Sequence, residues 1–361
     1  MYLRVFEISE VAALADAAAA VQGASGVRSL IVLLAEGQGW SASALDAWAR
    51  RQTLPLLGGV FPRVLAQRRL LAHGGVVVGL PWAAPVHRIA LAAQPQIPAA
   101  LAQAASLLVL TDGLGAHIQP LIDALYNEVG VGVRTVGGGC GSLSLRQQPC
   151  VLTAQGFEAD VAAVAALPVP LTLGVRHGWQ PLDAGLVLEA TEAQGNVVHT
   201  LNWEPALTVY RRLVEPVAGV AIDADNFFEV AKAFPLGLLR ADGEFIVRDP
   251  IRVEGEALVC VGAVRPHTTL TLLTGSPQTL LQAAGDLGRL SAPTVSGRLV
   301  FDCISRVLFL GEDSGFSAEL QRLVPDEVPT AGALTLGEVA GGIPTQRLAF
   351  CNKTATLALL P

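Results

Sequence analysis

The sequence RLVFDCISR, residues 298–306, decides how the C-terminal part of the chain folds. Its apolar residues at 299–304 have the length of a buried strand, and Arg306 lies just after them. Three apolar residues then recur at the i, i+4, i+7 spacing of an amphipathic helix: Phe316, Leu320 and Leu323. The stretch therefore predicts a strand followed by a helix that packs on a sheet.

Two more strands are expected after this helix, at residues 332–339 and 348–360. The sequence GGIP at 341–344 lies between them and favours a turn. The C-terminal segment would then be a unit that consists of a strand, a helix and a hairpin.

The same order of elements occurs upstream, beginning at Ser29 and at Ser106 as it does at Arg298. The clearest helix belongs to the second occurrence, because apolar residues recur on one face throughout residues 118–129. A repeated strand–helix–hairpin unit is one explanation. The other is the chance alternation of strands and helices that any α/β protein can show.

The glycine-rich run GGGCG at residues 137–141 raises the question of a phosphate-binding loop. It lacks the Lys that such a loop requires, and no clear helix is expected to begin after it. We expect instead a tight turn or a close approach of two backbone segments.

The composition favours an α/β fold. Hydrophobic residues make up 52% of the 361 residues and charged residues 15%, below the roughly 25% that is typical of soluble proteins. Such a chain suits mixed β-sheets that flanking helices bury. We expect two related halves built from the repeated units, and the low share of charge is also compatible with a homodimer.

Several classes of protein are excluded by simple counts. A net charge of −7 without a Lys/Arg cluster argues against nucleic-acid binding. No uninterrupted apolar stretch is long enough to span a membrane, and the first residues do not resemble an export signal. The five cysteines are odd in number and lack C-x-x-C spacing, so we expect reduced, buried thiols and a cytoplasmic protein.

Polar residues gather near the expected strand ends of the C-terminal segment: Cys303, Arg306, Glu338, Asn352 and Thr354. A charged side chain at the end of a buried strand either finds a partner or faces a cleft. Both outcomes are open here. Arg306 and Glu338 form a structural ion pair, or they line a ligand site.

These residues also carry a resemblance to a known family. The pattern Cys-x-x-Arg, Gly-x-x-Thr-x-Gly-Glu and Asn-x-Thr resembles that of the FIST C domain, and it is filled by Cys303, Arg306, Gly332, Thr335, Gly337, Glu338, Asn352 and Thr354. Residues 234–250, which include Arg248, are similar to the opening strands of the same domain. The passage around residues 175–206 resembles the junction of tandem FIST domains, although Trp179 and Gln180 replace the Cys and Arg of the family.

The resemblance implies an intracellular sensory protein rather than an enzyme, with a FIST N-like domain at 1–205 and a FIST C-like domain at 206–361. It implies a small ligand, such as an amino acid, in a cleft between the two halves. Arg306 and Arg248 would hold its carboxylate, Glu338 its ammonium group and Asn352 either group. The output would pass to a separate signalling protein, such as a histidine kinase or a cyclic-di-GMP enzyme.

Two alternatives remain. Some FIST-type proteins are haem-based nitric oxide sensors, and His177 is then the first choice of axial ligand; otherwise no cofactor is expected. An enzyme without a recognisable motif is the other alternative, with Cys303 beside Arg306 as a thiol of lowered pKa. An inert, buried Cys303 is the simpler interpretation.

Overall fold

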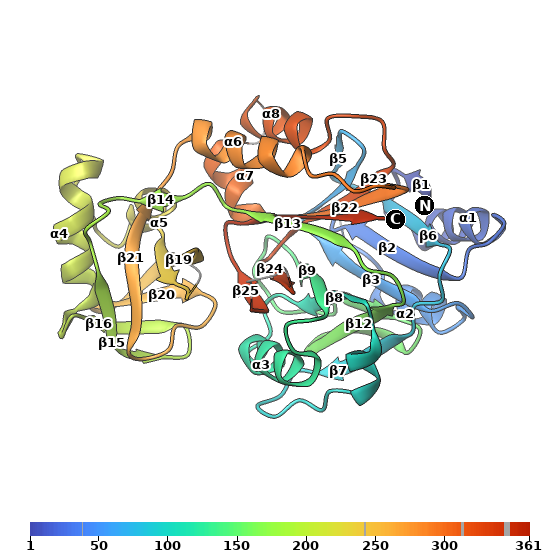
Figure 1. Cartoon of the computed structure of the whole chain (residues 1–361), viewed down its shortest axis with the longest axis horizontal. Helices are drawn as coiled ribbons and strands as arrows, with labels where there is room; N and C mark the ends of the chain where they lie inside the picture. Colours follow the sequence, from blue (N-terminus) through green and yellow to red (C-terminus); the bar gives the residue numbers. More distant parts are fainter. Residues whose placement is uncertain (38, 242, 312–313, 343–346) are drawn as a thin grey trace.

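A parallel pair of strands with its connecting helix or helices occurs three times in this computed structural model, which describes residues 1–37, 39–241, 243–311, 314–342 and 347–361. The first unit contains β2 (Ser29–Ala35), α2 (Ala42–Ala49) and β3 (Leu56–Phe61). The second contains β8 (Ser106–Asp112), α3 (Ile118–Val129) and β9 (Arg134–Cys140). The third contains β22 (Gly297–Cys303), α7 (Ile304–Leu310), α8 (Ser314–Leu323) and β23 (Thr330–Thr335). The repeat beginning at Ser29, Ser106 and Arg298 is thus confirmed (Figure 1).

Each unit contributes a hairpin that pairs with the sheet of another unit. The hairpin β4 (Arg63–Ala66) and β5 (Arg69–Leu71) pairs with β23. The hairpin β10 (Val151–Thr153) and β11 (Gly156–Glu158) pairs with β3, and β24 (Glu338–Gly341) with β25 (Ala349–Cys351) pairs with β9. The three units are therefore interlocked and cannot separate without breaking sheets.

After each hairpin the chain returns to its own sheet. The returning strands β6 (Gly75–Leu80), β12 (Val161–Leu167) and β26 (Ala355–Leu360) run antiparallel to β2, β8 and β22. The edge strands β1 (Tyr2–Phe6), β7 (Val86–Ala90) and β13 (Thr172–Arg176) pair with them. The result is three six-stranded mixed sheets, which together with their helices we call the body.

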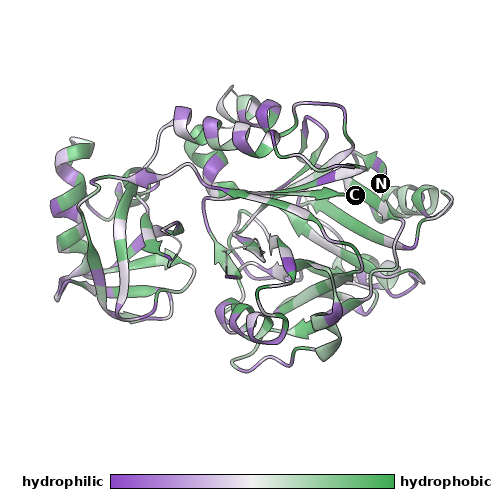
Figure 2. Ribbon diagram, viewed as in Figure 1, coloured by the Kyte–Doolittle hydropathy of each residue, from purple (hydrophilic) through white to green (hydrophobic). Residues whose placement is uncertain are grey.

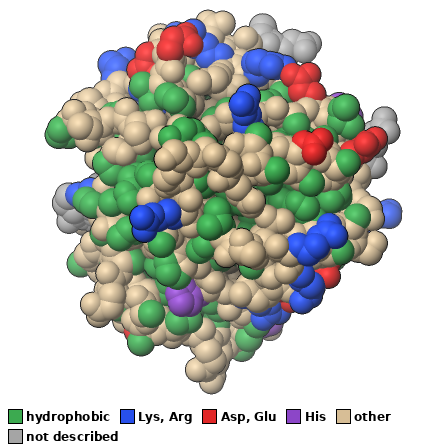
Figure 3. Space-filling model, turned by 90° about the vertical axis from the view of Figure 1, so that its right-hand side faces the viewer, with side chains coloured by type: hydrophobic (Ala, Val, Ile, Leu, Met, Phe, Trp, Pro, Cys, Tyr) green, Lys and Arg blue, Asp and Glu red, His purple; other side chains and the backbone are tan. Residues whose placement is uncertain are grey.

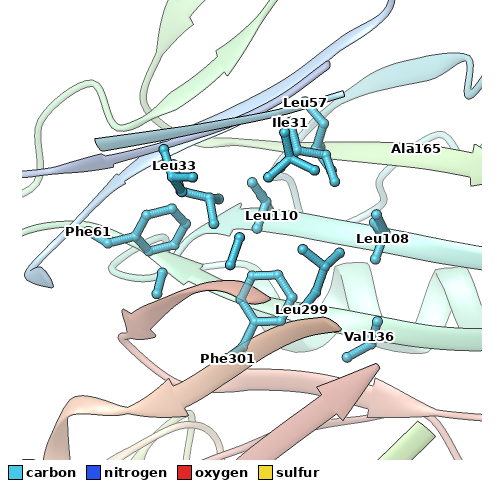
Figure 4. Close-up of a cluster of buried hydrophobic side chains, with 14 of the residues drawn as sticks. Ile31, Leu33, Leu57, Phe61, Leu108, Leu110, Val136, Ala165, Leu299 and Phe301 are labelled. Atoms are coloured by element: carbon cyan, nitrogen blue, oxygen red, sulfur yellow. The ribbon is translucent and has the colours of Figure 1, made fainter. Parts of the chain in front are cut away.

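The inner faces of these three sheets meet in one core. Figure 4 shows Ile31 and Phe61 from one sheet, Leu108 and Leu110 from the second, and Phe301 from the third, all pointing toward one another. Each of these side chains is at most 2% exposed. The strands are correspondingly hydrophobic along their length, as Figure 2 shows. Hydrophobic side chains also lie among scattered charges on the face seen in Figure 3, as expected from the low share of charged residues.

A separate β-rich module is inserted before the third unit, between β13 and helix α6 (Pro277–Gly288). It forms an eight-stranded sheet that lies at the left in Figure 1. Its elements are β14 (Gln180–Pro181), β15 (Leu188–Gln194), β16 (Val197–Leu201), β17 (Glu204–Pro205), α4 (Ala206–Ala218), α5 (Phe227–Ala231), β18 (Leu236–Leu239), β19 (Phe245–Glu254), β20 (Ala257–Val261) and β21 (Thr268–Thr274). The expected boundary at 205/206 falls inside this module, between β17 and α4.

Two of the strands expected from the sequence are each divided in two. The stretch 332–339 turns at Gly337, whose φ is +88°, and passes from β23 in one sheet to β24 in another. The stretch 348–360 is divided between β25 and β26 by residues 352–354. The turn predicted at 341–344 lies partly outside the described residues, because 343–346 are not among them.

Other differences are local. Arg306 lies in helix α7 rather than at a strand end. Between β7 and β8 the chain forms the 3₁₀ turn η1 (Ala99–Gln103). The run 137–141 is no tight turn: β9 passes so close to its neighbour that a Cβ at Gly137 would lie 1.8 Å from the carbonyl oxygen of Val109. The close backbone approach is thus the correct alternative. Helix α1 (Val11–Gln22) lies between β1 and β2, and in the described ranges no helix has the length and hydropathy needed to cross a bilayer.

Candidate functional site

The six residues proposed from the sequence all lie near the carboxyl end of β22 or at the adjoining face of the module, and all are buried. Arg306 and Glu338 are 0% exposed and Arg248, the most exposed of the six, is 4% exposed. The others are Cys303, Asn352 and Thr354. The structure therefore gathers them in one region but encloses most of them in protein.

Arg306 does not pair with Glu338. Because α7 begins directly after β22, the Arg306 guanidinium lies one helical turn from Asp302, with Nε 3.0 Å from Oδ1. It also pairs with Glu319 of α8 and donates to the carbonyl oxygens of His177 and Leu280. Burial alone would lower the pKa of Arg306, but the two carboxylates raise it. Arg306 thus joins α7, α8 and α6 in the interior.

Glu338 is held by other residues. The hydroxyl of Thr335 donates to Glu338 Oε1 at 2.7 Å, and Cys303 lies beside it. Burial raises the pKa of Glu338 well above its ordinary value, and the pKa of Asp302 is raised by burial and by Glu319. Burial also raises the pKa of the Cys303 thiol, which is the opposite of what an activated nucleophile needs.

The module and the body are joined by a buried polar contact that the sequence did not reveal. Lys353 Nζ lies 3.2 Å from Asp249 Oδ2, and both side chains are 0% exposed. Lys353 also donates to the carbonyl oxygen of Lys232 at 2.9 Å and lies over the ring of Trp179. One of the chain's two lysines, in a segment of apolar residues, was the available signal, because a buried Lys requires a partner.

Arg248 makes the second such contact. Its Nη1 donates to the carbonyl oxygen of Phe350 at 3.0 Å and to Asn352 Oδ1 at 3.3 Å. Its Nε donates to the carbonyl oxygen of Ala263 at 2.9 Å. Of the predicted residues, Arg248 and Asn352 are thus in direct contact across the boundary between module and body.

A cavity of about 350 Å³ lies at this boundary. We call it the arginine pocket, since Arg240, Arg248, Arg265 and Arg347 line it together with Asp123. The module contributes the first three of these arginines, and α3 and the segment before β25 contribute Asp123 and Arg347. A smaller cavity of about 30 Å³ is lined by Arg240 and Thr354 among others.

Side-chain contacts hold the lining of the arginine pocket, some between lining residues and one with Tyr126 of α3. Asp123 pairs with Arg265 and lies 3.8 Å from Arg347. The guanidinium of Arg347 lies over the ring of Tyr126, 4.4 Å from its centroid. Among the described residues that line the pocket, four are arginines and one is an aspartate, and guanidinium groups are suited to an anion.

His177, the residue considered as a haem ligand, is held by a backbone hydrogen bond. Its Nδ1 accepts the backbone N–H of Trp179 at 3.0 Å, which places the proton of a neutral ring on Nε2. Burial, Arg306 and Arg176 lower the pKa of His177 to about 4, so the ring is neutral at pH 7. In this tautomer the lone pair of Nδ1 accepts the N–H of Trp179 and Nε2 carries the proton. The cavities that His177 lines measure about 220 and 30 Å³, smaller than the roughly 300–1,000 Å³ of typical ligand pockets.

Comparisons with known proteins agree with the resemblance noted from the motifs. The sequence profile of the FIST N domain matches residues 16–204, and that of the FIST C domain matches residues 206–341. No curated protein matches the chain.

Proposed function

The chain belongs to the FIST family, with the FIST N and FIST C domains in tandem, and on that premise we propose that it is a sensor whose small ligand binds in the arginine pocket. FIST domains are sensory domains of signal transduction, for which small ligands have been proposed. The observation that carries the proposal is the convergence of four arginines on a cavity between the module and the body.

The charges of the pocket favour a ligand with a carboxylate or phosphate group. Guanidinium groups bind such groups through paired hydrogen bonds, and they do so most strongly where little water competes. An amino acid would place its carboxylate against the arginines and its ammonium group toward Asp123. Asp123 would thus bind the ammonium group, the role that the sequence analysis gave to Glu338. The side chain of Glu338 is buried in the protein.

The position of the pocket supports a role in signalling. Its walls come from two parts of the chain that are linked through Arg248 and Lys353, so a ligand that contacts both walls would hold the module against the body. A separate signalling protein, such as a histidine kinase or a cyclic-di-GMP enzyme, would then recognise the arrangement in which the ligand holds the module against the body. The five cysteines are buried free thiols, which supports a place in the reducing cytoplasm.

The alternatives have less support. The hydrogen bond at Nδ1 of His177 argues against a haem sensor. The raised pKa of Cys303 argues against a thiolate enzyme at this position. A small-ligand sensor is the function that the geometry favours.

Calorimetric titration with phosphate, acetate, glycine and aspartate tests the proposal, with Arg265→Ala and Arg289→Ala as matched variants. Both arginines are exposed, and each pairs with an aspartate of its own, Arg265 with Asp123 and Arg289 with Asp286. Of the two, Arg265 lines the arginine pocket and Arg289 does not. We expect Arg265→Ala to weaken anion binding about tenfold or more, as for a lost hydrogen bond between charged groups. Arg289→Ala should bind as the parent does. Equal binding by both variants would refute the pocket.

A further inference from the structure

Another cavity, of about 340 Å³, lies at the carboxyl ends of β2 and β3. It forms where the hairpin β10–β11 of the second unit joins the sheet of the first, and none of the described residues that line it belongs to the arginine pocket. We call it the Glu36 pocket. In α/β proteins the carboxyl ends of parallel strands are a common place for ligands.

The charge in the Glu36 pocket is opposite to that in the arginine pocket. Among the described residues that line it, Glu36 is the one that carries a charge. Glu36 is half-buried, and the backbone N–H of Leu143 donates to its Oε2 at 3.1 Å. An acceptor-only group in an otherwise uncharged cavity favours a ligand that is cationic and donates hydrogen bonds.

Aromatic and apolar side chains form the rest of the walls. Trp40 and Phe157 line the pocket, together with Val60 of β3. The indole of Trp40 is held in place, since its Nε1 donates to the carbonyl oxygen of Ala35 at 2.7 Å and its ring packs edge-on against Phe6. Aromatic faces attract cations, and the apolar surface favours a hydrocarbon body.

The corresponding position in the second unit is closed by the protein itself. Asp112, at the end of β8, is 1% exposed and accepts the backbone N–H groups of Leu114 and Asp160 at 3.0 and 2.9 Å. The side chain of Gln147 also donates to it. In the second unit, protein groups therefore fill the space at the carboxyl end of β8. In the first unit, the corresponding space at the carboxyl end of β2, beside Glu36, is open.

From these contacts we propose that the Glu36 pocket binds a small organic cation, namely a primary ammonium group on a short apolar body. The ammonium group pairs with the Glu36 carboxylate, and the apolar body packs between Trp40, Phe157 and Val60. This site is separate from the proposed sensor site, so either proposal can fail alone.

Butylammonium chloride and its neutral counterpart butan-1-ol are suitable probes. Titration is followed by calorimetry and by the indole N–H resonance of Trp40, which Trp40→Phe identifies. We expect Glu36→Gln to weaken butylammonium binding about tenfold or more, while butan-1-ol binds weakly to both proteins. Phe157→Leu keeps the apolar wall but removes the ring face, and it should weaken butylammonium binding several-fold.

Two control variants make the test specific. Glu327→Gln removes an exposed carboxylate that lies outside the pocket, and it should leave butylammonium binding unchanged. Arg265→Ala should also leave it unchanged, because Arg265 belongs to the other pocket. The proposal is overturned if butylammonium fails to bind at tens of millimolar, if butan-1-ol binds equally well, or if a folded Glu36→Gln protein binds as the parent does.

Discussion

The ammonium group of Lys353 lies 3.2 Å from Asp249 Oδ2, and neither side chain is exposed to solvent. Asp249 belongs to β19 of the module, and Lys353 lies between β25 and β26 of the body. The backbone of Lys353 has a φ of +50°, which is unfavourable for a side chain of this kind. This ion pair therefore joins the two parts of the molecule at a position where the chain also changes sheets.

Lys353→Met should destabilise the protein strongly, because it leaves the carboxylate of Asp249 buried without its cation. Breaking a buried pair in this way costs about 3–5 kcal/mol. Chemical denaturation of the parent, Lys353→Met, Asp249→Asn and the double variant gives the coupling energy. The double variant should recover part of the loss. Simple additivity of the two losses would show that the residues do not interact.

Arg306→Lys should lower stability while leaving anion binding in the arginine pocket intact. Arg306 reaches two carboxylates and two carbonyl oxygens, and Lys keeps the charge but not the planar fork. Each hydrogen bond lost to a charged group costs about 1.5–3 kcal/mol. Melting temperature and phosphate titration distinguish the roles. Normal stability combined with lost binding would instead assign Arg306 to the ligand.

Leu357→Ala should cost about 2–5 kcal/mol, since a buried Leu is replaced without refilling the space. Leu357 is 0% exposed in β26, where it packs with residues of α6 and α8. Leu308→Ala is the matched control, because Leu308 is 40% exposed on α7. Urea denaturation should show little change for that variant. A near-neutral Leu357→Ala would mean that β26 is not central to the body.

Stability should fall in acid because of His177. Burial lowers its pKa from 6.5 to about 4, so between these values the unfolded chain binds a proton that the folded chain does not. The contribution of His177 is therefore present above pH 6.5 and is lost as the pH falls toward 4. His177→Gln should show a smaller drop in melting temperature over this range. An identical drop in both proteins would remove His177 as the cause.

Local patterns along the chain accounted for much of the fold. Ser41 accepts the N–H of Ala44 at the start of α2, as expected for an N-cap, and Ile118–Val129 is a helix with the predicted buried face. Ser276 and Pro277 begin α6 with a capping box. Such features depend on residues a few positions apart, so spacing alone reveals them.

The sequence by itself determined the α/β class, and it indicated the three repeated units and the gathering of the polar residues near strand ends. Only the tertiary structure decided which of these residues touch. The division of 332–339 between two sheets separates Glu338 from Arg306, and α8 brings Glu319 to Arg306 instead. Arg240, Arg265 and Arg347 meet in one pocket because the inserted module packs against α3 and β25. Pairing between distant segments carries no local periodicity, since it arises from burial of whole faces, and so spacing along the chain could not reveal it.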